Sequence, residues 1–131
     1  MGLRGKKEFG IKRFFKSFKY SIEGLDYAYK NEQSMFIHFI AILLVTLTGF
    51  FLKINTIEWL FCICMFGIIM GAELLNTAIE AVVDMVMPDI HPLAKIAKDT
   101  ASAAVFVLSI MTAIVGLIIF LPKIFNLLGW F

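Results

Sequence analysis

Four polar residues recur at helical spacing in a part of the chain that is otherwise apolar: Glu73, Asn76, Glu80 and Asp84. At about 100° per residue they share one stripe, about 80° wide, on a single helix face. Three acids on one face repel each other unless a cation lies between them. Mg²⁺ suits that position, because it is commonly bound by one or two carboxylates together with phosphate oxygens. A carboxylate of this stripe could also act as a general base that removes a hydroxyl proton.

These residues leave two kinds of function open. A metal site, a lysine that balances phosphate charge and a carboxylate base are the parts of a phosphoryl-transfer enzyme. The chain contains neither a G-x-x-x-x-G-K-[ST] nor a G-x-G-x-x-G nucleotide motif. A small membrane oligomer that conducts protons or ions would use a similar stripe, and from the residues alone the two functions rank equally. A third, structural interpretation is that the stripe joins helices through Lys95 or Lys98. We favour it less, because an asparagine alone would join helices at lower cost.

The composition indicates whether water or membrane lipid surrounds the protein. About 60% of the 131 residues are apolar or aromatic, against roughly 45–50% in an ordinary soluble domain. A soluble fold of this size could not bury so much apolar surface, because small domains bury the smallest fraction of their chain. Composition therefore excludes a soluble enzyme, a disordered tail and a nucleic-acid-binding module, and it predicts an integral membrane protein.

Three stretches lack Asp, Glu, Lys and Arg: residues 33–52, 59–72 and 100–122. The first contains His38, which we expect to pack against another helix rather than to bind a ligand. A helix needs about 20 residues to cross a hydrocarbon core about 30 Å thick. The middle stretch crosses only if it continues through the polar stripe, which places Glu73 about 22 Å along the helix from Glu58. An ionised carboxylate at that depth costs at least about 2.5–3.5 kcal/mol, so a functional role is the default expectation.

The distribution of Lys and Arg predicts the orientation. With three spans, the N-terminal segment and the loop before the third span share one side, which carries ten of the twelve Lys and Arg residues. The other side carries two, Lys53 and Lys123. The N-terminus and the polar end of the middle helix are therefore expected in the cytoplasm. Glu32, Lys98 and Asp99, at the cytoplasmic starts of the first and third spans, are expected to lie near the stripe.

Apolar and cationic side chains recur at helical spacing ahead of the first span. The apolar positions are Phe14, Phe15, Phe18, Ile22, Leu25 and Tyr29, and the cationic ones are Lys12, Arg13, Lys16 and Lys19. We expect an amphipathic helix over about residues 9–30, lying on the inner membrane surface with its cations near anionic lipid. The expected fold is an all-α integral membrane domain of residues 1–131, with spans over about 33–52, 57–87 and 97–122.

The segment Glu73-Leu-Leu-Asn-Thr-Ala-Ile-Glu80-Ala-Val-Val-Asp84, followed by Ala97-Lys98-Asp99, resembles the prokaryotic diacylglycerol kinase family of small membrane lipid kinases. The similarity extends to Arg13, Lys19-Tyr20-Ser21, Gly24-Leu25 and Asn31-Glu32. Residues 57–59, 91–95 and 116–123 are similar to the Gram-positive undecaprenol kinase branch. The resemblance implies ATP-dependent phosphorylation of a lipid alcohol, undecaprenol first and diacylglycerol as the alternative, at the cytoplasmic face of the bacterial plasma membrane. It also implies a homotrimer, each chain having three spanning helices and a surface helix.

The resemblance further implies a role for individual residues. Glu73 matches the catalytic base, and Glu32 and Glu80 match the Mg²⁺ ligands. The nucleotide-contacting positions correspond to Arg13, Tyr20, Glu32, Glu80, Asp89, His91, Lys98 and Asp99. The positions that line the lipid-headgroup site correspond to Asn76 and Ser102, with Asp84 in a supporting position.

Overall fold

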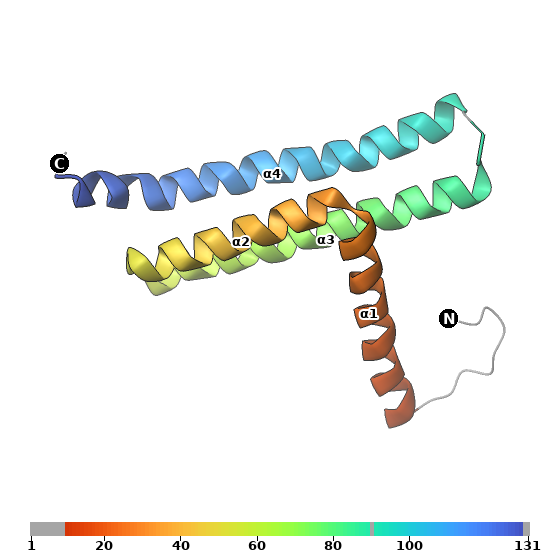
Figure 1. Ribbon diagram of the computed structural model, residues 1–131, viewed down its shortest axis with the longest axis horizontal. Coiled ribbons are helices and arrows are strands. Elements are labelled where there is room, and N and C mark those ends of the chain that lie inside the picture. The colour runs from red at the N-terminus through yellow and green to blue at the C-terminus, as the bar shows by residue number, and fades with distance from the viewer. Residues whose placement is uncertain (1–9, 90, 130–131) are drawn as a thin grey trace.

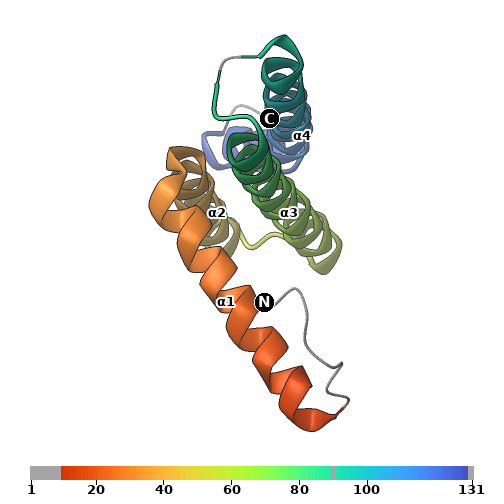
Figure 2. The same ribbon diagram turned by 90° about the vertical axis from the view of Figure 1, so that its right-hand side faces the viewer.

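The computed structural model describes residues 10–89 and 91–129, and within them it contains four α-helices and no strand. The helices are α1 (Ile11–Asn31), α2 (Gln33–Phe51), α3 (Thr56–Val86) and α4 (Pro92–Leu127). α3 and α4 form a long antiparallel hairpin, and α2 lies beside α3 (Figure 1). α1 projects away from these three helices, as both views show (Figure 2). The expected all-α fold is confirmed for the described residues.

Three of the helices are long and apolar enough to cross a membrane: α2, α3 and α4. At 1.5 Å per residue, the 19 residues of α2 cover about 28 Å and the 31 residues of α3 about 46 Å. A hydrocarbon core is about 30 Å thick, so the length of α2 approximately matches it, whereas α3 has several extra turns. Those turns extend past the start of α2, on the side of the molecule from which α1 projects (Figure 1).

The starts of the two longest helices have clear local causes. At the start of α3, Asn55 Oδ1 accepts from the Glu58 N–H at 3.0 Å, and the Asn55 N–H donates to the Glu58 carboxylate at 2.7 Å. This reciprocal pair satisfies two N–H groups that the first turn leaves without partners. α4 begins at Pro92, a residue well suited to a first helical position. The Leu93 N–H donates to His91 Nδ1 at 3.2 Å.

α4 is longer at both ends than the range 97–122 expected from the sequence. It starts at Pro92, so that Lys95 lies in its first turns. The expected range was set by the apolar stretch, which ends where charged residues begin. The helix itself continues beyond that stretch. At the other end it continues through Pro122 to Leu127. A proline inside a membrane helix is tolerated where neighbouring groups satisfy the freed backbone carbonyl.

The end of the bundle away from α1 holds the apolar core. Its buried residues come from α3, α4 and the loop before α3: Ile54, Cys62, Ile119 and Phe120. Gly49 packs closely on Trp59. A Cβ added to this glycine would therefore lie only 2.9 Å from a ring carbon of Trp59. Lys123 Nζ lies 3.1 Å from the Glu58 carboxylate and joins α4 to α3. This end of the molecule is therefore held together mainly by packing.

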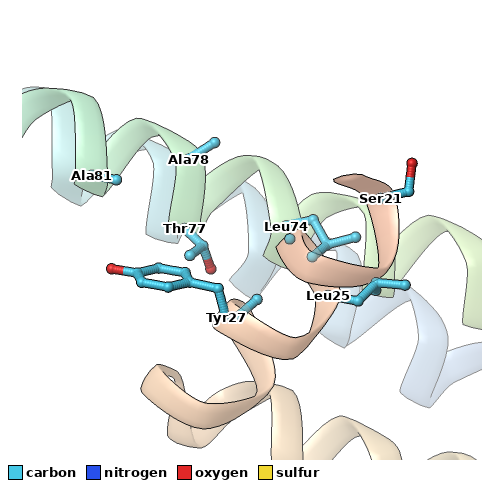
Figure 3. Close-up of a pocket in the computed structure, with 9 residues that line it drawn as sticks. Ser21, Leu25, Tyr27, Leu74, Thr77, Ala78 and Ala81 are labelled. Atoms are coloured by element: carbon cyan, nitrogen blue, oxygen red, sulfur yellow. The ribbon is translucent and has the colours of Figure 1, made fainter. Parts of the chain in front are cut away.

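An apolar groove of about 460 Å³ lies between α1 and α3 (Figure 3). The residues that line it are Ser21, Gly24, Leu25, Tyr27 and Ala28 of α1, and Leu74, Thr77, Ala78 and Ala81 of α3. Thr77 connects this groove to the polar stripe, because its hydroxyl donates to the Glu73 backbone carbonyl at 3.0 Å. The groove and the stripe therefore share one stretch of α3.

Candidate active site

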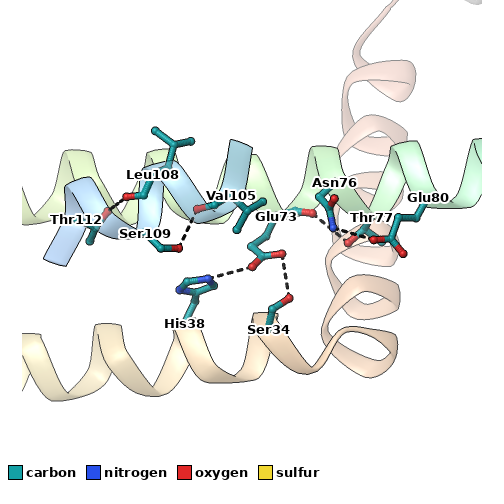
Figure 4. A network of polar contacts seen from close by, with 10 residues as sticks. All are labelled: Ser34, His38, Glu73, Asn76, Thr77, Glu80, Val105, Leu108, Ser109 and Thr112. Carbon is teal, nitrogen blue, oxygen red and sulfur yellow. Dashed lines mark hydrogen bonds and ion pairs between the residues drawn. The ribbon is translucent and has the colours of Figure 1, made fainter. Parts of the chain in front are cut away.

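The most buried residue of the polar stripe is Glu73, which is 1% exposed. Two residues of α2 contact its carboxylate (Figure 4). The Ser34 hydroxyl donates to Oε2 at 3.0 Å, and His38 Nε2 lies 3.0 Å from Oε1. A buried carboxylate needs such partners, because an isolated ionised group is very costly in an apolar medium. The packing of α2 on α3 thus supplies both partners of this acid.

Two buried acceptor atoms among the described residues have no hydrogen-bond donor: Glu73 Oε1 and Asn76 Oδ1. His38 is close to the first of these, but its ring N–H is not aligned for a hydrogen bond, so a lone pair of Oε1 remains available. Asn76 is 7% exposed, and its amide donates to Glu80 Oε1 at 3.2 Å. Buried polar atoms of this kind are nearly always satisfied in native proteins. The two acceptors therefore suit a bound group that carries hydroxyl protons or positive charge.

Further along the stripe, one cation lies between two acids. Lys98 Nζ donates to both carboxylate oxygens of Asp84, at 3.0 and 3.1 Å, and lies 3.8 Å from Glu80 Oε2. All three side chains are partly exposed, Asp84 the most at 64%. Solvent weakens such pairs, so Lys98 lowers the repulsion within the stripe without being locked in place. The neighbouring Lys95 instead pairs with Asp99, within its own helix.

Glu32 approaches the stripe from the break between α1 and α2. Its extended backbone ends α1 and caps α2. The pKa of Glu32 is raised, first because burial disfavours its charged form and then because the charges of Glu80 and Glu73 are near; Lys98 opposes the shift. The acid at the break between α1 and α2 is therefore close enough to feel the acids of α3, and Lys98 is the cation that offsets this repulsion at Glu32.

The donor set fits Mg²⁺. No group of three or more His, Cys, Asp or Glu side chains within residues 10–89 and 91–129 lies close enough to enclose a metal ion. Mg²⁺ does not need one, since it is usually held by one or two carboxylates, waters and substrate phosphates. Glu32, Glu80 and the unpaired Asn76 oxygen offer hard oxygen ligands in one region.

A second cavity, of about 340 Å³, lies between the end of α3 and the start of α4. Its polar lining brings together four positions expected to contact the nucleotide, and the acid in the supporting position: Asp89, His91, Lys98, Asp99 and Asp84. The other expected nucleotide contacts do not line this cavity: Arg13, Tyr20, Glu32 and Glu80. Arg13 and Tyr20 lie exposed on α1, and Ser102 is exposed on α4; these three line neither of the two cavities.

The sequence did not connect Ser34 and His38 with the site. They lie one helical turn apart on α2 and both face Glu73 (Figure 4). A signal was available, because they are four positions apart in an apolar stretch and therefore share a helix face. The helix that contacts this face depends on the rotation of α2 about its axis, and the sequence pattern does not give that rotation.

Comparisons with known proteins agree on one family. Residues 19–120 match the family described as prokaryotic diacylglycerol kinase. The undecaprenol kinase of Bacillus subtilis is 41% identical over 114 residues, which cover 87% of this chain and 93% of that protein. The diacylglycerol kinase of Haemophilus influenzae is 42% identical over 114 residues (86% and 92%). The diacylglycerol kinase of Escherichia coli K12 is 36% identical over 105 residues (80% and 86%).

Proposed function

The chain belongs to the prokaryotic diacylglycerol kinase family and is a lipid kinase; we propose that it transfers the γ-phosphoryl group of ATP to the hydroxyl of undecaprenol. The observation that carries this proposal is the buried Glu73 carboxylate, which keeps one acceptor lone pair free. The B. subtilis relative, an undecaprenol kinase, supports this choice of acceptor. Diacylglycerol is the second candidate, because the H. influenzae and E. coli relatives are diacylglycerol kinases.

In the proposed reaction Glu73 removes the proton from the lipid hydroxyl. The alcohol oxygen forms a bond to the γ-phosphorus, the bond from that phosphorus to the bridging oxygen of ADP breaks, and the proton stays on Glu73 until it passes to water. Glu80 lies about 10.5 Å further along the α3 axis, towards the polar cavity at the end of the helix. Acceptor and donor therefore approach from opposite sides, as in-line displacement requires.

Mg²⁺ and ATP are the partners that this chemistry needs. Mg²⁺ would be held by Glu32 and Glu80, and when bound it would neutralise charge on the phosphates. Lys98, in the cavity between α3 and α4, supplies a second positive charge for the nucleotide. His91 and Asp99 line the same cavity. The nearby groove between α1 and α3 has a largely apolar lining, which suits a hydrocarbon tail better than a nucleotide.

We further propose that the active site faces the cytoplasm of a bacterial cell and that α1 lies on the inner membrane surface. The support is the ten-to-two distribution of Lys and Arg, together with the polar ends of α3 and α4, which lie at the end of the bundle from which α1 projects (Figure 1). α1 buries only Ala28 in this chain, so most of its apolar side chains remain available to lipid.

A homotrimer is the proposed assembly, in which the exposed apolar faces of the spanning helices contact other copies and the membrane lipids.

The acceptor is tested by competition. Purified protein in mixed micelles receives undecaprenol and diacylglycerol at equal mole fraction with radiolabelled ATP and Mg²⁺, and the labelled lipids are separated. We expect undecaprenyl phosphate to form faster. Faster labelling of diacylglycerol would overturn the choice of acceptor but not the reaction type. Labelling of neither lipid by folded protein would overturn the proposed function.

A further inference from the structure

His38 and Ser34 hold the Glu73 carboxylate from the same side. Ser34 donates to Oε2, and His38 Nε2 lies 3.0 Å from Oε1 (Figure 4). A nitrogen and an oxygen at this distance would repel each other if both presented lone pairs, so we assign the ring proton to Nε2, although this N–H is not aligned with an Oε1 lone pair. The side chain of His38 is 20% exposed and that of Glu73 only 2%. The contact is therefore largely shielded from solvent.

We propose that His38 is a positioning residue for the general base. Its Nε2–H group, with the Ser34 hydroxyl, fixes the plane of the Glu73 carboxylate, so that the free lone pair of Oε1 faces the lipid hydroxyl. This inference rests on the proposed lipid kinase function and assigns to His38 a role that acts through Glu73.

The charges around Glu73 make this partner necessary. The other titratable groups near it are acids: Glu80 follows on the same helix, and Glu32 approaches from the start of α2. Lys98 is engaged with Asp84 and lies 3.8 Å from Glu80. Among the described residues, His38 is the group that brings a ring N–H, or a positive charge when protonated, within 3.0 Å of this carboxylate.

The angular mismatch of the His38 contact also has a consequence. Because the ring N–H is not aligned with an Oε1 lone pair, that lone pair remains free. A well-aligned hydrogen bond would compete with the substrate hydroxyl for the same atom. The observed arrangement holds a ring N–H beside the carboxylate and still leaves an acceptor position. A base must combine these two properties.

The test measures kcat and KM separately for three variants. His38→Ala removes the contact, whereas His38→Gln retains a donor, since the glutamine amide nitrogen can occupy nearly the place of Nε2. Thr46→Val is the matched control, because the Thr46 hydroxyl donates only to the Ile42 carbonyl of its own helix. A misplaced reacting group can lower the reaction rate on the order of 10²-fold.

We expect a loss of that size in kcat for His38→Ala. The KM values for ATP and for lipid should stay within about twofold of the parent, because no binding group has changed. His38→Gln should recover most of kcat, and Thr46→Val should match the parent.

Other results would overturn the proposal. If His38→Ala retains kcat while Glu73→Gln loses it, His38 does not position the base, although the lipid kinase function stands. If His38→Gln is as inactive as His38→Ala while both melt at the parent temperature, donation is not the role of the imidazole. Should His38→Ala unfold, His38→Gln is measured in its place, both in the parent and in the Glu73→Gln background, and kcat is calculated per folded protein. Residues that act through one another are not additive, so a further tenfold loss from His38→Gln in that background would show an independent role. A parent protein that phosphorylates no lipid would instead contradict the proposed function.

Discussion

Replacing Glu73 by glutamine should abolish most of the activity and leave the fold intact. The amide is nearly isosteric: its oxygen can still accept from the Ser34 hydroxyl, and its NH₂ group can donate to His38 Nε2 once the ring proton has moved to Nδ1. The change also removes a carboxylate that is 1% exposed, whose charge costs at least about 2.5–3.5 kcal/mol within the hydrocarbon. Thermal stability should therefore equal or exceed that of the parent. Loss of a general base typically lowers the rate by about 10²–10⁴-fold.

That loss should appear in kcat rather than in nucleotide binding. A 10²–10⁴-fold decrease corresponds to a barrier higher by about 2.7–5.4 kcal/mol. Glu73 does not line the polar cavity between α3 and α4, so the apparent affinity for ATP should change little. The assay follows transfer of label from ATP to lipid at saturating substrates, beside ATP binding and a melting curve in the same detergent.

The control for this experiment is Glu23→Gln, the same chemical change on the exposed face of α1, where Glu23 lies 3.7 Å from Lys19. It should leave kcat unchanged. If Glu73→Gln keeps kcat within a few-fold of the parent, another group accepts the proton and the assignment of the base is wrong. If activity and melting temperature fall together, Glu73 holds helices together and is not primarily catalytic.

Three further predictions test the metal, the fold and the orientation. Glu80→Gln should raise the Mg²⁺ concentration needed for half-maximal activity, because a hard cation loses a charged ligand; an unchanged Mg²⁺ titration would remove this residue from the metal site. Gly49→Ala should lower the melting temperature, since overpacking costs about 1–3 kcal/mol and the new Cβ would lie 2.9 Å from the Trp59 ring; kcat should hold, and an unchanged melting temperature would show that this contact relaxes freely. In a background without native cysteines, a cysteine at Asn55 should react with an impermeant thiol reagent in intact cells and one at Lys95 only after permeabilisation; the reverse pattern would place the site outside.

Much of the site could be predicted because it lies on one helix. Once residues 73–84 are helical, the 100° rotation per residue places Glu73, Asn76, Glu80 and Asp84 on one face whatever the rest of the chain does. The structure agrees at short range: the Asn76 amide donates to Glu80, four residues further on. Hydrophobic length likewise identified the spanning helices, because the membrane demands a minimum length of apolar helix.

Partners on different helices could not be predicted in the same way. Lys98 reaches across to Asp84, whereas Lys95, three residues earlier on α4, pairs with Asp99 within its own helix. The sequence placed Lys98 near the stripe, but as a link between helices either lysine was possible, and only the rotation of α4 relative to α3 separates them. The contact of His38 with Glu73 depends in the same way on how α2 packs against α3. Helical periodicity gives the face of each residue but not the neighbour that this face meets.

The distribution of polar contacts also decides between the two functions that the residues alone left open. An ion or proton pathway needs polar groups along the whole depth of the membrane. Along α3 the 14 residues between Glu58 and Glu73 contain no ionisable group other than the two cysteines. The described hydroxyls at that depth on neighbouring helices donate to carbonyls of their own helices: those of Thr46, Thr48, Ser109 and Thr112. The acids and their lysine are instead confined to one end of the bundle, next to a polar cavity and an apolar groove. A polar cavity open to a water-soluble substrate and an apolar groove open to a lipid suit the transfer of a group from one substrate to the other. They do not suit the conduction of ions or protons through the membrane.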